Sequence, residues 1–444
     1  KLGTFKFVAE KVGEDTFLSQ IIKMVSEATA SRAPIQDLAD RVSAYFVPSV
    51  LIIFILSAVF WIFIGMGFNF ALTTFISVMI IACPCALGLA TPTGVLVGMG
   101  IGAEQGILIK SAESLQKAQS IDTVVFDKTG TLTKGKPEII DVISNPKPKI
   151  QISNMEILLY AAIAEKRSEH PLAEAILNKA KGEGIEIPEP ESFNAIPGKG
   201  IEASYKGRSI LLGNRMLMEE RKIGIEEMRL GIEELEEDGK TVMVLAIDFK
   251  VEGVLGVADT LKEYSREAVS ELQRMGKKVV MITGDNRRTA SAIAKEAGVD
   301  HVISEVLPQD KASEIKKLQA EGRRVAMVGD GINDAPALAQ ADLGIAIGTG
   351  TDIAIETGDI VLIKEDLRDV VSAITLSSYA MRKIKQNLFW AFFYNSLGIP
   401  IAAGVLYPFT GFLLNPIIAG AAMAFSSVSV VTNSLLMRYF WRRY

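Results

Sequence analysis

Two long stretches of the chain, residues 42–103 and 386–437, contain no charged residue, whereas charged residues are frequent elsewhere. A membrane-spanning helix needs about 20 apolar residues, so each stretch is long enough for two spans. Turn-forming residues divide both stretches, at 65–69 in the first and at Tyr407-Pro408 in the second. The pattern therefore predicts two pairs of membrane helices, with spans at 47–64, 71–102, 389–406 and 415–436.

The segment between the helix pairs alternates short apolar runs with helical patterns. Residues 121–126 form the first run, and helical patterns at 263–275 and 289–297 separate later ones. This alternation is typical of a parallel sheet with helices on both faces. Residues 138–255 separate the first strand from the others, which indicates a domain inserted into the sheet domain. The other predicted strands are 278–282, 324–328, 343–347 and 360–363.

Composition and charge narrow the classes of function. A net charge of −5 gives no support for a nucleic-acid partner, and two cysteines this close in sequence provide no disulfide framework. The chain begins with Lys1 and shows no signal peptide, so we expect it to be part of a longer protein. Basic residues flank the spans on the side of the soluble segment, which the positive-inside rule assigns to the cytoplasm. They are Arg382, Lys383, Lys385, Arg438, Arg442 and Arg443.

Both cysteines, Cys83 and Cys85, flank Pro84 within the first uncharged stretch. Proline removes a backbone donor and breaks the helix, which lipid tolerates only where other protein groups satisfy the freed carbonyls. Thiolates bind soft metals such as Cu(I) or Zn(II) in preference to Mg²⁺. The tripeptide is therefore a candidate metal site on an ion path, and two small cysteines packed between helices are the alternative.

Polar residues directly follow several of the predicted strands. The carboxyl ends of parallel strands gather at one edge of a sheet, so these side chains should converge. An aspartate nucleophile can split phosphoryl transfer into two steps, and the anionic group needs cations and aligned donors. One such aspartate would most simply be a helix cap, but four matched strand ends favour catalysis. The candidates are Asp127, Lys128, Thr129, Thr283, Gly284, Asp285, Lys311, Asp330, Asn333 and Asp334.

Several roles within this set follow from the chemistry of the side chains. Lys311 can neutralise phosphate oxygens, and Thr283 with the amides near Gly284 can donate hydrogen bonds. Asn333 would help to fix the phosphate and the metal shell. Magnesium prefers oxygen ligands, which we expect from Asp127, Thr129, Asp330 and Asp334.

The inserted segment contains a weaker set of candidate ligand-binding residues. His170 precedes a proline at a helix start and can contact a base, and paired glycines let the backbone approach a ligand closely. Taken alone, a single histidine is more often structural. The set is Glu165, His170, Gly198, Gly200, Gly213 and Asn214, whereas His301 fits no motif and is expected at the surface.

These motifs resemble a known family from about residue 15 onward. Asp127-Lys-Thr-Gly-Thr, Thr283-Gly-Asp285 and Gly329-Asp-Gly-Ile-Asn-Asp334 look like the signatures of P-type cation-pumping ATPases. The resemblance implies a haloacid-dehalogenase-like phosphorylation domain in which ATP phosphorylates Asp127. It also implies that the insert is the α+β nucleotide-binding domain of the heavy-metal subfamily, with the six residues above lining an ATP pocket and His170 orienting the purine.

The same resemblance bears on the transported ion. In the heavy-metal subfamily, polar residues on the last two spans join the Cys-Pro-Cys span, and the matching residues here are Tyr394, Asn395, Met423 and Ser427. Packing of Met423 and an interhelical hydrogen bond from Tyr394 or Asn395 are the structural alternatives. A soft cage of low charge suits Cu(I), and Ag(I) would fit it too. A Zn or Cd pump would be expected to place a carboxylate in these spans, and neither uncharged stretch has one.

The sequence departs from the family pattern in one respect. No Thr-Gly-Glu, the dephosphorylating loop of the actuator domain, occurs, and the nearest string is Thr357-Gly-Asp359. Residues 1–13 resemble the last actuator strand, so the rest of that domain is expected as a partner segment of the same protein. The domains implied are 1–41 (end of the actuator and connecting helices), 42–103 (first membrane pair), 104–137 and 256–376 (phosphorylation domain), 138–255 (nucleotide-binding domain) and 377–444 (second membrane pair).

The expected function is export of Cu(I) across a membrane, most simply the cell membrane, with ATP and Mg²⁺ as cofactors and a copper chaperone or chelate as donor. Metal binding should couple to Asp127 through a helix that continues from Gly88 toward Lys110. A Zn or Cd pump is the near alternative. A membrane-anchored phosphatase would not need the nucleotide insert, and a non-enzymatic metal receptor or channel would not need the aligned carboxylates.

Overall fold

The computed structural model describes residues 31, 33–146, 152–168, 170–196, 198–330, 334–348 and 356–441. The predicted actuator strand at residues 1–13 and the candidate Asn333 lie outside these ranges, as do Arg442 and Arg443. The chain divides into two compact units. The first comprises Lys1–Ile121, Ala341–Glu365 and Asp369–Tyr444, and the second comprises Asp122–Gln340 and Asp366–Arg368.

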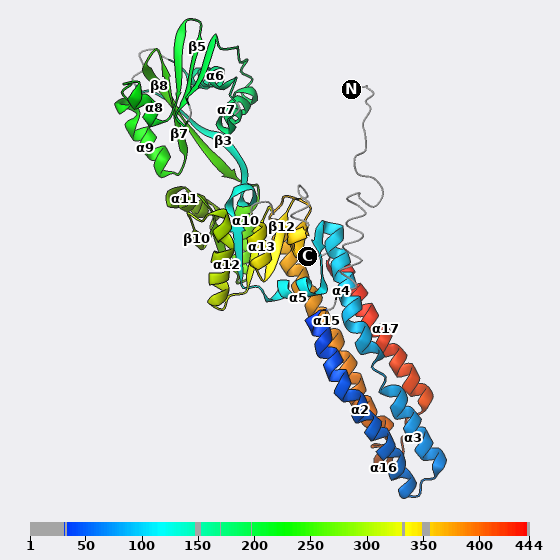
Figure 1. Cartoon of the computed structure of the whole chain (residues 1–444). Helices are drawn as coiled ribbons and strands as arrows, with labels where there is room; N and C mark the ends of the chain where they lie inside the picture. Colours follow the sequence, from blue (N-terminus) through cyan, green and yellow to red (C-terminus); the bar gives the residue numbers. More distant parts are fainter. Residues whose placement is uncertain are drawn as a thin grey trace, which may run out of the picture. The chain divides into compact units, whose positions relative to one another are not determined.

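Long helices dominate the first unit and run side by side (Figure 1). They are α2 (Pro34–Phe63), α3 (Phe68–Ile81), α4 (Cys85–Gln105), α15 (Arg368–Ala402) and α17 (Pro416–Trp441), with the short α16 (Tyr407–Thr410) between the last two. Within the described residues, three helical segments are long and apolar enough to cross a membrane: Pro34–Phe63, Phe68–Gln105 and Pro416–Trp441. The predicted third span falls in the second half of α15, whose first half is charged and whose apolar half also contains Gln386, Asn387 and Asn395.

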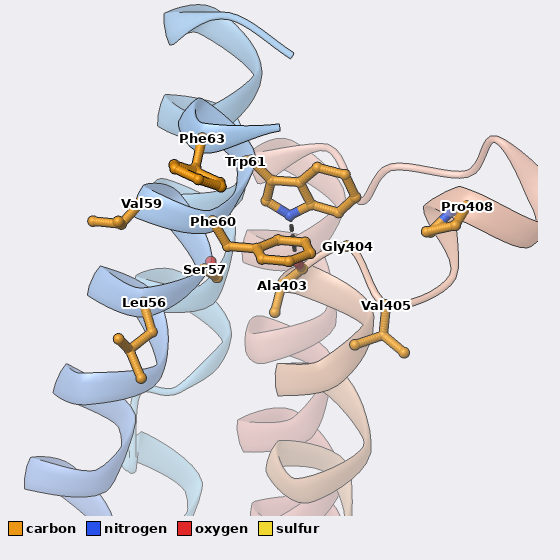
Figure 2. Close-up of a pocket in the computed structure, with 10 residues that line it drawn as sticks. All are labelled: Leu56, Ser57, Val59, Phe60, Trp61, Phe63, Ala403, Gly404, Val405 and Pro408. Atoms are coloured by element: carbon orange, nitrogen blue, oxygen red, sulfur yellow. Dashed lines mark hydrogen bonds between the residues drawn. The ribbon is translucent and has the colours of Figure 1, made fainter. Parts of the chain in front are cut away.

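The ends of α2 and α15 are joined by a specific contact (Figure 2). The indole Nε1 of Trp61 donates a hydrogen bond of 2.9 Å to the carbonyl of Ala403. Gly404 follows with φ +87°, and a Cβ there would lie 2.9 Å from the indole ring. Glycine is therefore required at this turn, because both the backbone conformation and the available space exclude a side chain.

The first unit also contains a small group of strands, in the order β1-β13-β12. Strand β1 (Ile107–Ile109) pairs antiparallel with β13 (Ile360–Leu362), which pairs parallel with β12 (Leu343–Ile347). The prediction of a helix continuing toward Lys110 is wrong, because α4 ends at Gln105. Gly106 adopts a left-handed conformation with φ +85° and caps the helix, and the chain then enters β1.

Four parallel strands form the sheet of the second unit, in the order β11-β2-β9-β10. The strands are β2 (Thr123–Asp127), β9 (Lys278–Ile282), β10 (His301–Ile303) and β11 (Val325–Gly329). Their parallel pairing confirms the prediction from the alternating pattern. The helices between them are α10 (Ser265–Arg274), α11 (Arg287–Ala297), α12 (Lys311–Ala320) and α13 (Ala335–Gln340), and His301 is exposed as expected.

A separate antiparallel sheet forms the insert, in the order β3-β8-β7-β6-β5-β4. Its strands are β3 (Thr133–Ser144), β4 (Ser192–Ile196), β5 (Gly200–Tyr205), β6 (Arg208–Gly213), β7 (Thr241–Ile247) and β8 (Lys250–Leu261). Helices α6 (Asn154–Glu165) and α7 (Pro171–Gly182) cover one face, and α8 (Arg215–Glu220) and α9 (Arg229–Glu237) cover the other (Figure 1). Each face has its own apolar core, around Ile157, Ile176 and Leu245 on one side and around Leu217, Ile232 and Val244 on the other.

Candidate active site and intramembrane sulfur site

The end of β2 presents Asp127 to a lysine from another element. Lys311, the first residue of α12, places its Nζ 2.7 Å from Asp127 Oδ1 and 2.6 Å from Asp334 Oδ1. All three side chains are buried. Burial and the neighbouring charge of Asp334 raise the pKa of Asp127 to about 6, against the opposing effect of Lys311. The lysine therefore holds two carboxylates together that would otherwise repel each other.

A second ion pair lies beside the first. Lys128 Nζ is 2.7 Å from Asp285 Oδ2, and the amide of Asp285 donates to Thr283 Oγ1 at 3.1 Å. Thr283 is buried at the end of β9, and Gly284 separates it from Asp285. The structure thus brings candidates from three strand ends and from α12 into one site. Asp330 follows β11 and lies close to Gly130, in the turn after Asp127. A Cβ added to Gly130 would be 3.7 Å from the Asp330 carboxylate.

Sequence reasoning missed Asp259, which lies in β8 where the insert returns to the sheet domain. Its carboxylate accepts hydrogen bonds from Thr133 Oγ1 at 2.5 Å and from the amide of Gly135 at 2.9 Å. Burial raises the pKa of Asp259, although the bond from Thr133 and the charge of Lys128 oppose this. Asp259, Lys128, Thr129 and Asp285 line one cavity of about 870 Å³. The sequence does contain a signal for Asp259, because this acidic residue directly follows the apolar run at 254–258. An acidic residue after an apolar run is the pattern that identified Asp127 and Asp330.

The carboxylates at this site fit the donor set of a hard cation. Asp334 Oδ2 is buried without a hydrogen-bond partner, and the charge of Asp330 contributes to the raised pKa of Asp334, after burial itself. Magnesium prefers such oxygen ligands. In the described part of the chain, no three His, Cys, Asp or Glu side chains are close enough to hold a metal. The ligand set of Asp127, Thr129, Asp330 and Asp334 therefore stays a prediction, with the Thr129 contribution expected from its backbone carbonyl.

All six residues predicted to bind a nucleotide line one cavity of about 310 Å³ in the inserted domain: Glu165, His170, Gly198, Gly200, Gly213 and Asn214. His170 caps α7, since its Nδ1 accepts a hydrogen bond from the amide of Leu172 at 3.2 Å. Its ring is fixed by this bond while the residue remains exposed. The histidine is thus both a structural cap and an available surface for a ligand.

Two glycines of this cavity are required by the packing of the strands, and close approach to a ligand stays a prediction for them. Gly200 and Gly213 are paired across β5 and β6, and a Cβ on either would lie 2.2 or 2.3 Å from a backbone carbonyl. They allow two strands to approach each other, which shapes the cavity wall. Asn214 fixes the adjoining loop, because its Nδ2 donates to the Gly198 carbonyl at 3.0 Å and its Oδ1 accepts from the Leu217 amide at 3.1 Å.

Glu165 is the buried acid of this cavity. It is the last residue of α6, only 3% of it is exposed, and Oε2 has no hydrogen-bond partner. Burial raises the pKa of Glu165 to about 7, with a hydrogen bond from Ser168 acting in the opposite direction. The carboxyl group can therefore be protonated near neutral pH and can donate a hydrogen bond to a ligand.

The Cys-Pro-Cys tripeptide forms the break between α3 and α4. Pro84 is the N-cap of α4 and departs from helical geometry, with φ −78° and ψ 27°. The structure joins Cys83 and Cys85 in a disulfide with their Cα atoms 5.4 Å apart. The predicted metal ligands are the thiolates of the reduced pair. The kink at Pro84 brings the two side chains together.

Two of the other predicted metal ligands lie beside this break. Asn395 is buried in α15, and its Nδ2 contacts the Cys83 carbonyl at 3.4 Å, while its Oδ1 has no partner. Met423 is buried in α17 within the same apolar cluster as Cys83. An amide side chain of α15 and a thioether of α17 therefore lie in the same region as the sulfur-bearing break between α3 and α4.

The remaining two predicted ligands are less buried than Asn395 and Met423. Tyr394 is 48% exposed, and its ring packs against Trp390 and Phe393. Ser427 is half-buried, whereas Ser426 is buried and its hydroxyl has no hydrogen-bond partner. The buried face of α17 therefore contains Met423 and the residue three positions later. The ligand roles of Tyr394 and Ser427 stay predictions.

The chain is similar to known proteins. Residues 121–342 match the family model of the haloacid dehalogenase-like hydrolases. The chain is 55% identical over 438 residues to a probable copper-exporting P-type ATPase of Archaeoglobus fulgidus, and equally to the copper-exporting P-type ATPase of Bacillus subtilis. Each alignment covers 98% of this chain and 53% of the relative, so the chain spans about half the length of these proteins. The crystal structure of a zinc-transporting PIB-type ATPase in an E2.Pi state is similar with a TM-score of 0.79 and 34% identity, covering 95% of this chain and 67% of that one.

The chain belongs to the haloacid dehalogenase-like hydrolases and, within them, to the P-type ATPases. Its similarity to copper-exporting members is greater than its similarity to the zinc-transporting structure. The fold class expected from the sequence, a sheet domain interrupted by an α+β insert and accompanied by apolar helices, is confirmed.

Proposed function

We propose that this chain is the catalytic and ion-binding part of a pump that uses ATP to export Cu(I), and also Ag(I), from the cytoplasm across the cell membrane. The observation that supports it most directly is the buried Asp127–Lys311–Asp334 group at the end of β2. A nucleophile, a cation and a second carboxylate at one sheet edge are the parts that phosphoryl transfer needs. The copper-exporting relatives favour this ion.

The chemistry assigns a role to each group. An oxygen of Asp127 attacks the γ-phosphorus of ATP, a new O–P bond forms, and the bond to the ADP oxygen breaks. Lys311 neutralises charge on the transferred group, and Thr283 donates a hydrogen bond to it. When bound to the carboxylates, Mg²⁺ supplies further neutralisation of the phosphate charge. The six residues of the inserted cavity hold the nucleotide.

The sulfur site supports a soft monovalent ion as the transported substrate. Reduced Cys83 and Cys85 supply thiolates, and Met423 and Asn395 approach the same turn. No carboxylate lies within residues 42–103 or 386–437 to balance a divalent ion. Soft sulfur ligands favour Cu(I). A copper chaperone or chelate would deliver the ion, and a Thr-Gly-Glu segment elsewhere in the same protein would dephosphorylate Asp127.

Metal-dependent labelling of the whole protein by ATP tests this proposal. Cu(I) or Ag(I) should stimulate formation of an acid-stable phosphoenzyme, and Asp127→Asn should abolish it. Cys83→Ser should lose the stimulation by metal while it still binds nucleotide, which separates the ion site from the catalytic site. Stimulation by divalent metals alone would favour a Zn or Cd pump instead, and labelling from small phosphate esters alone would favour a phosphatase.

A further inference from the structure

A polar cavity of about 520 Å³ lies in the first unit, and none of its lining residues belongs to the candidate active site or to the sulfur site. Helix α5 (Ala112–Ser120) contributes Gln119, and α15 contributes Ser378, Arg382, Lys385, Gln386 and Phe389. Ser378, Arg382, Lys385 and Phe389 recur three or four positions apart, so they share one face of that helix. Neither a nucleotide-binding nor a predicted metal-binding residue is among them.

The charge of this cavity is positive and uncompensated by the residues that line it. Arg382 is exposed and forms no ion pair with any described residue, and Lys385 Nζ donates only to the neutral Gln119 Oε1, at 3.3 Å. Lys383, between them, points elsewhere, since its Nζ donates to Asn433 Oδ1 at 3.1 Å. The lining residues therefore offer two cations and no carboxylate to a ligand, which favours an anion.

The position of the cavity indicates which kind of molecule carries the anionic group. Lys385 is the last charged residue before the uncharged stretch 386–437, so the cavity lies where α15 enters the membrane. On α4 and α17 the charged residues nearest the same boundary, Glu104 and Arg438, pair with each other. The two cations of α15 have no such partner among the described residues, and they lie at the level of lipid headgroups.

An apolar wall continues the cavity into the membrane. Phe389 is 60% exposed and lies one helical turn beyond Lys385, against the rings of Trp390 and Phe393. A free phosphate ion would gain nothing from such a wall. A phospholipid would use both parts, with its phosphate beside the cations and the start of its acyl chains beside Phe389.

We propose that the cavity between α5 and α15 binds the headgroup of an anionic phospholipid, with Arg382 and Lys385 holding the phosphate and Phe389 supporting the acyl chains. The site would anchor the middle of α15, where its uncharged half begins, and that half also contains Asn395. It is independent of the transported ion, because none of its residues belongs to the sulfur site.

Native mass spectrometry of the whole protein can test this without copper or ATP. Phosphatidylglycerol should bind more tightly than phosphatidylcholine with the same acyl chains. Replacing both cations, Arg382→Gln with Lys385→Gln, should weaken phosphatidylglycerol about thirtyfold and leave phosphatidylcholine nearly unchanged. Lys117→Gln is the matched control, because this α5 cation already pairs with Glu113 and does not line the cavity, and it should bind lipid like the parent protein.

Two further measurements distinguish a phospholipid from a free phosphate ion as the occupant of the cavity. Phe389→Ser should weaken both lipids to a similar degree, and millimolar inorganic phosphate should not displace phosphatidylglycerol. Equal binding of phosphatidylglycerol by the double variant and the parent would overturn the proposal, as would displacement by inorganic phosphate. Retained nucleotide binding in each variant verifies that the protein is folded.

Discussion

The buried carboxyl group of Glu165 makes the stability of the inserted domain depend on pH. Its pKa is raised from an ordinary 4.5 to about 7, mainly by burial at the end of α6. Between these two values the unfolded chain releases the proton and the folded domain retains it. The domain should therefore lose stability as pH rises from 4.5 to 7, and this loss should stop above 7, where both states are ionised.

The magnitude follows from the two pKa values. For a single group titrating at 4.5 in the unfolded state and about 7 in the folded state, the free energy of unfolding falls by about 2.5 kcal/mol between pH 5 and pH 8. Glu165→Gln removes the titrating group and should abolish this part of the pH dependence. Any change in the stability of the variant that comes from placing an amide in the cavity is the same at both pH values. It therefore does not affect the difference in the free energy of unfolding between pH 5 and pH 8.

Hydrogen exchange of the α6 amides in the whole protein measures this effect. The free energy of opening, corrected for the intrinsic exchange rate at each pH, should differ between pH 5 and pH 8 in the parent and much less in Glu165→Gln. Glu174→Gln is the matched control, since this carboxylate is exposed on the neighbouring helix α7. If the parent and Glu165→Gln showed the same change with pH, the argument from burial would be refuted.

Three pairs of substitutions test the packing of other positions. Gly213→Ala should abolish nucleotide binding and lower the free energy of unfolding, followed by thermal unfolding, by at least about 2 kcal/mol, because the added Cβ would lie 2.3 Å from a carbonyl. Gly182→Ala should be tolerated, because open space surrounds that position. Lys311→Met should prevent phosphoenzyme formation. It should also lower the free energy of unfolding by about 3–5 kcal/mol in denaturant titrations, because two buried carboxylates lose their cation. Lys311→Arg keeps the charge and should lose less stability. Gly404→Ala should lower the thermal midpoint more than Trp61→Phe, which removes one hydrogen bond worth about 1 kcal/mol.

The segment between the two helix pairs could be predicted well, because its apolar strands alternate with charged segments and the two differ strongly in hydropathy. Strands such as 121–126 and 278–282 are apolar runs between charged segments, and the structure places β2 and β9 there. The functional residues at their ends then follow from the geometry of parallel sheets. The short strand β1 could not be recognised, since its three apolar residues come almost directly after an apolar helix and only Gly106 marks the boundary.

The membrane helices were predictable in extent but not in orientation. Lipid and protein interior are both apolar, so a helix such as α17 gives little contrast between its buried and exposed faces. A spacing of four placed Met423 and Ser427 on one face, yet a spacing of three, to Ser426, lies almost as close to the helical period. The structure buries Ser426 and leaves Ser427 half-buried. Polar side chains in spans therefore need the packed structure before their direction can be assigned.

Asp259 shows a different limit, which is long-range pairing. Thr133 and Asp259 are separated by the whole inserted domain, and nothing local in either segment indicates that they meet. Pairing of β3 with β8 lets Thr133 donate a hydrogen bond to Asp259. The Gly135 amide donates a second bond to the same carboxylate, which holds Gly135 beside the turn that follows Asp127. The strand that returns from the nucleotide-binding insert thus fixes the turn that contains Thr129. A displacement of β8 would shift the turn that follows Asp127 through these two bonds, so Asp259 is a means by which the insert and Asp127 can affect each other.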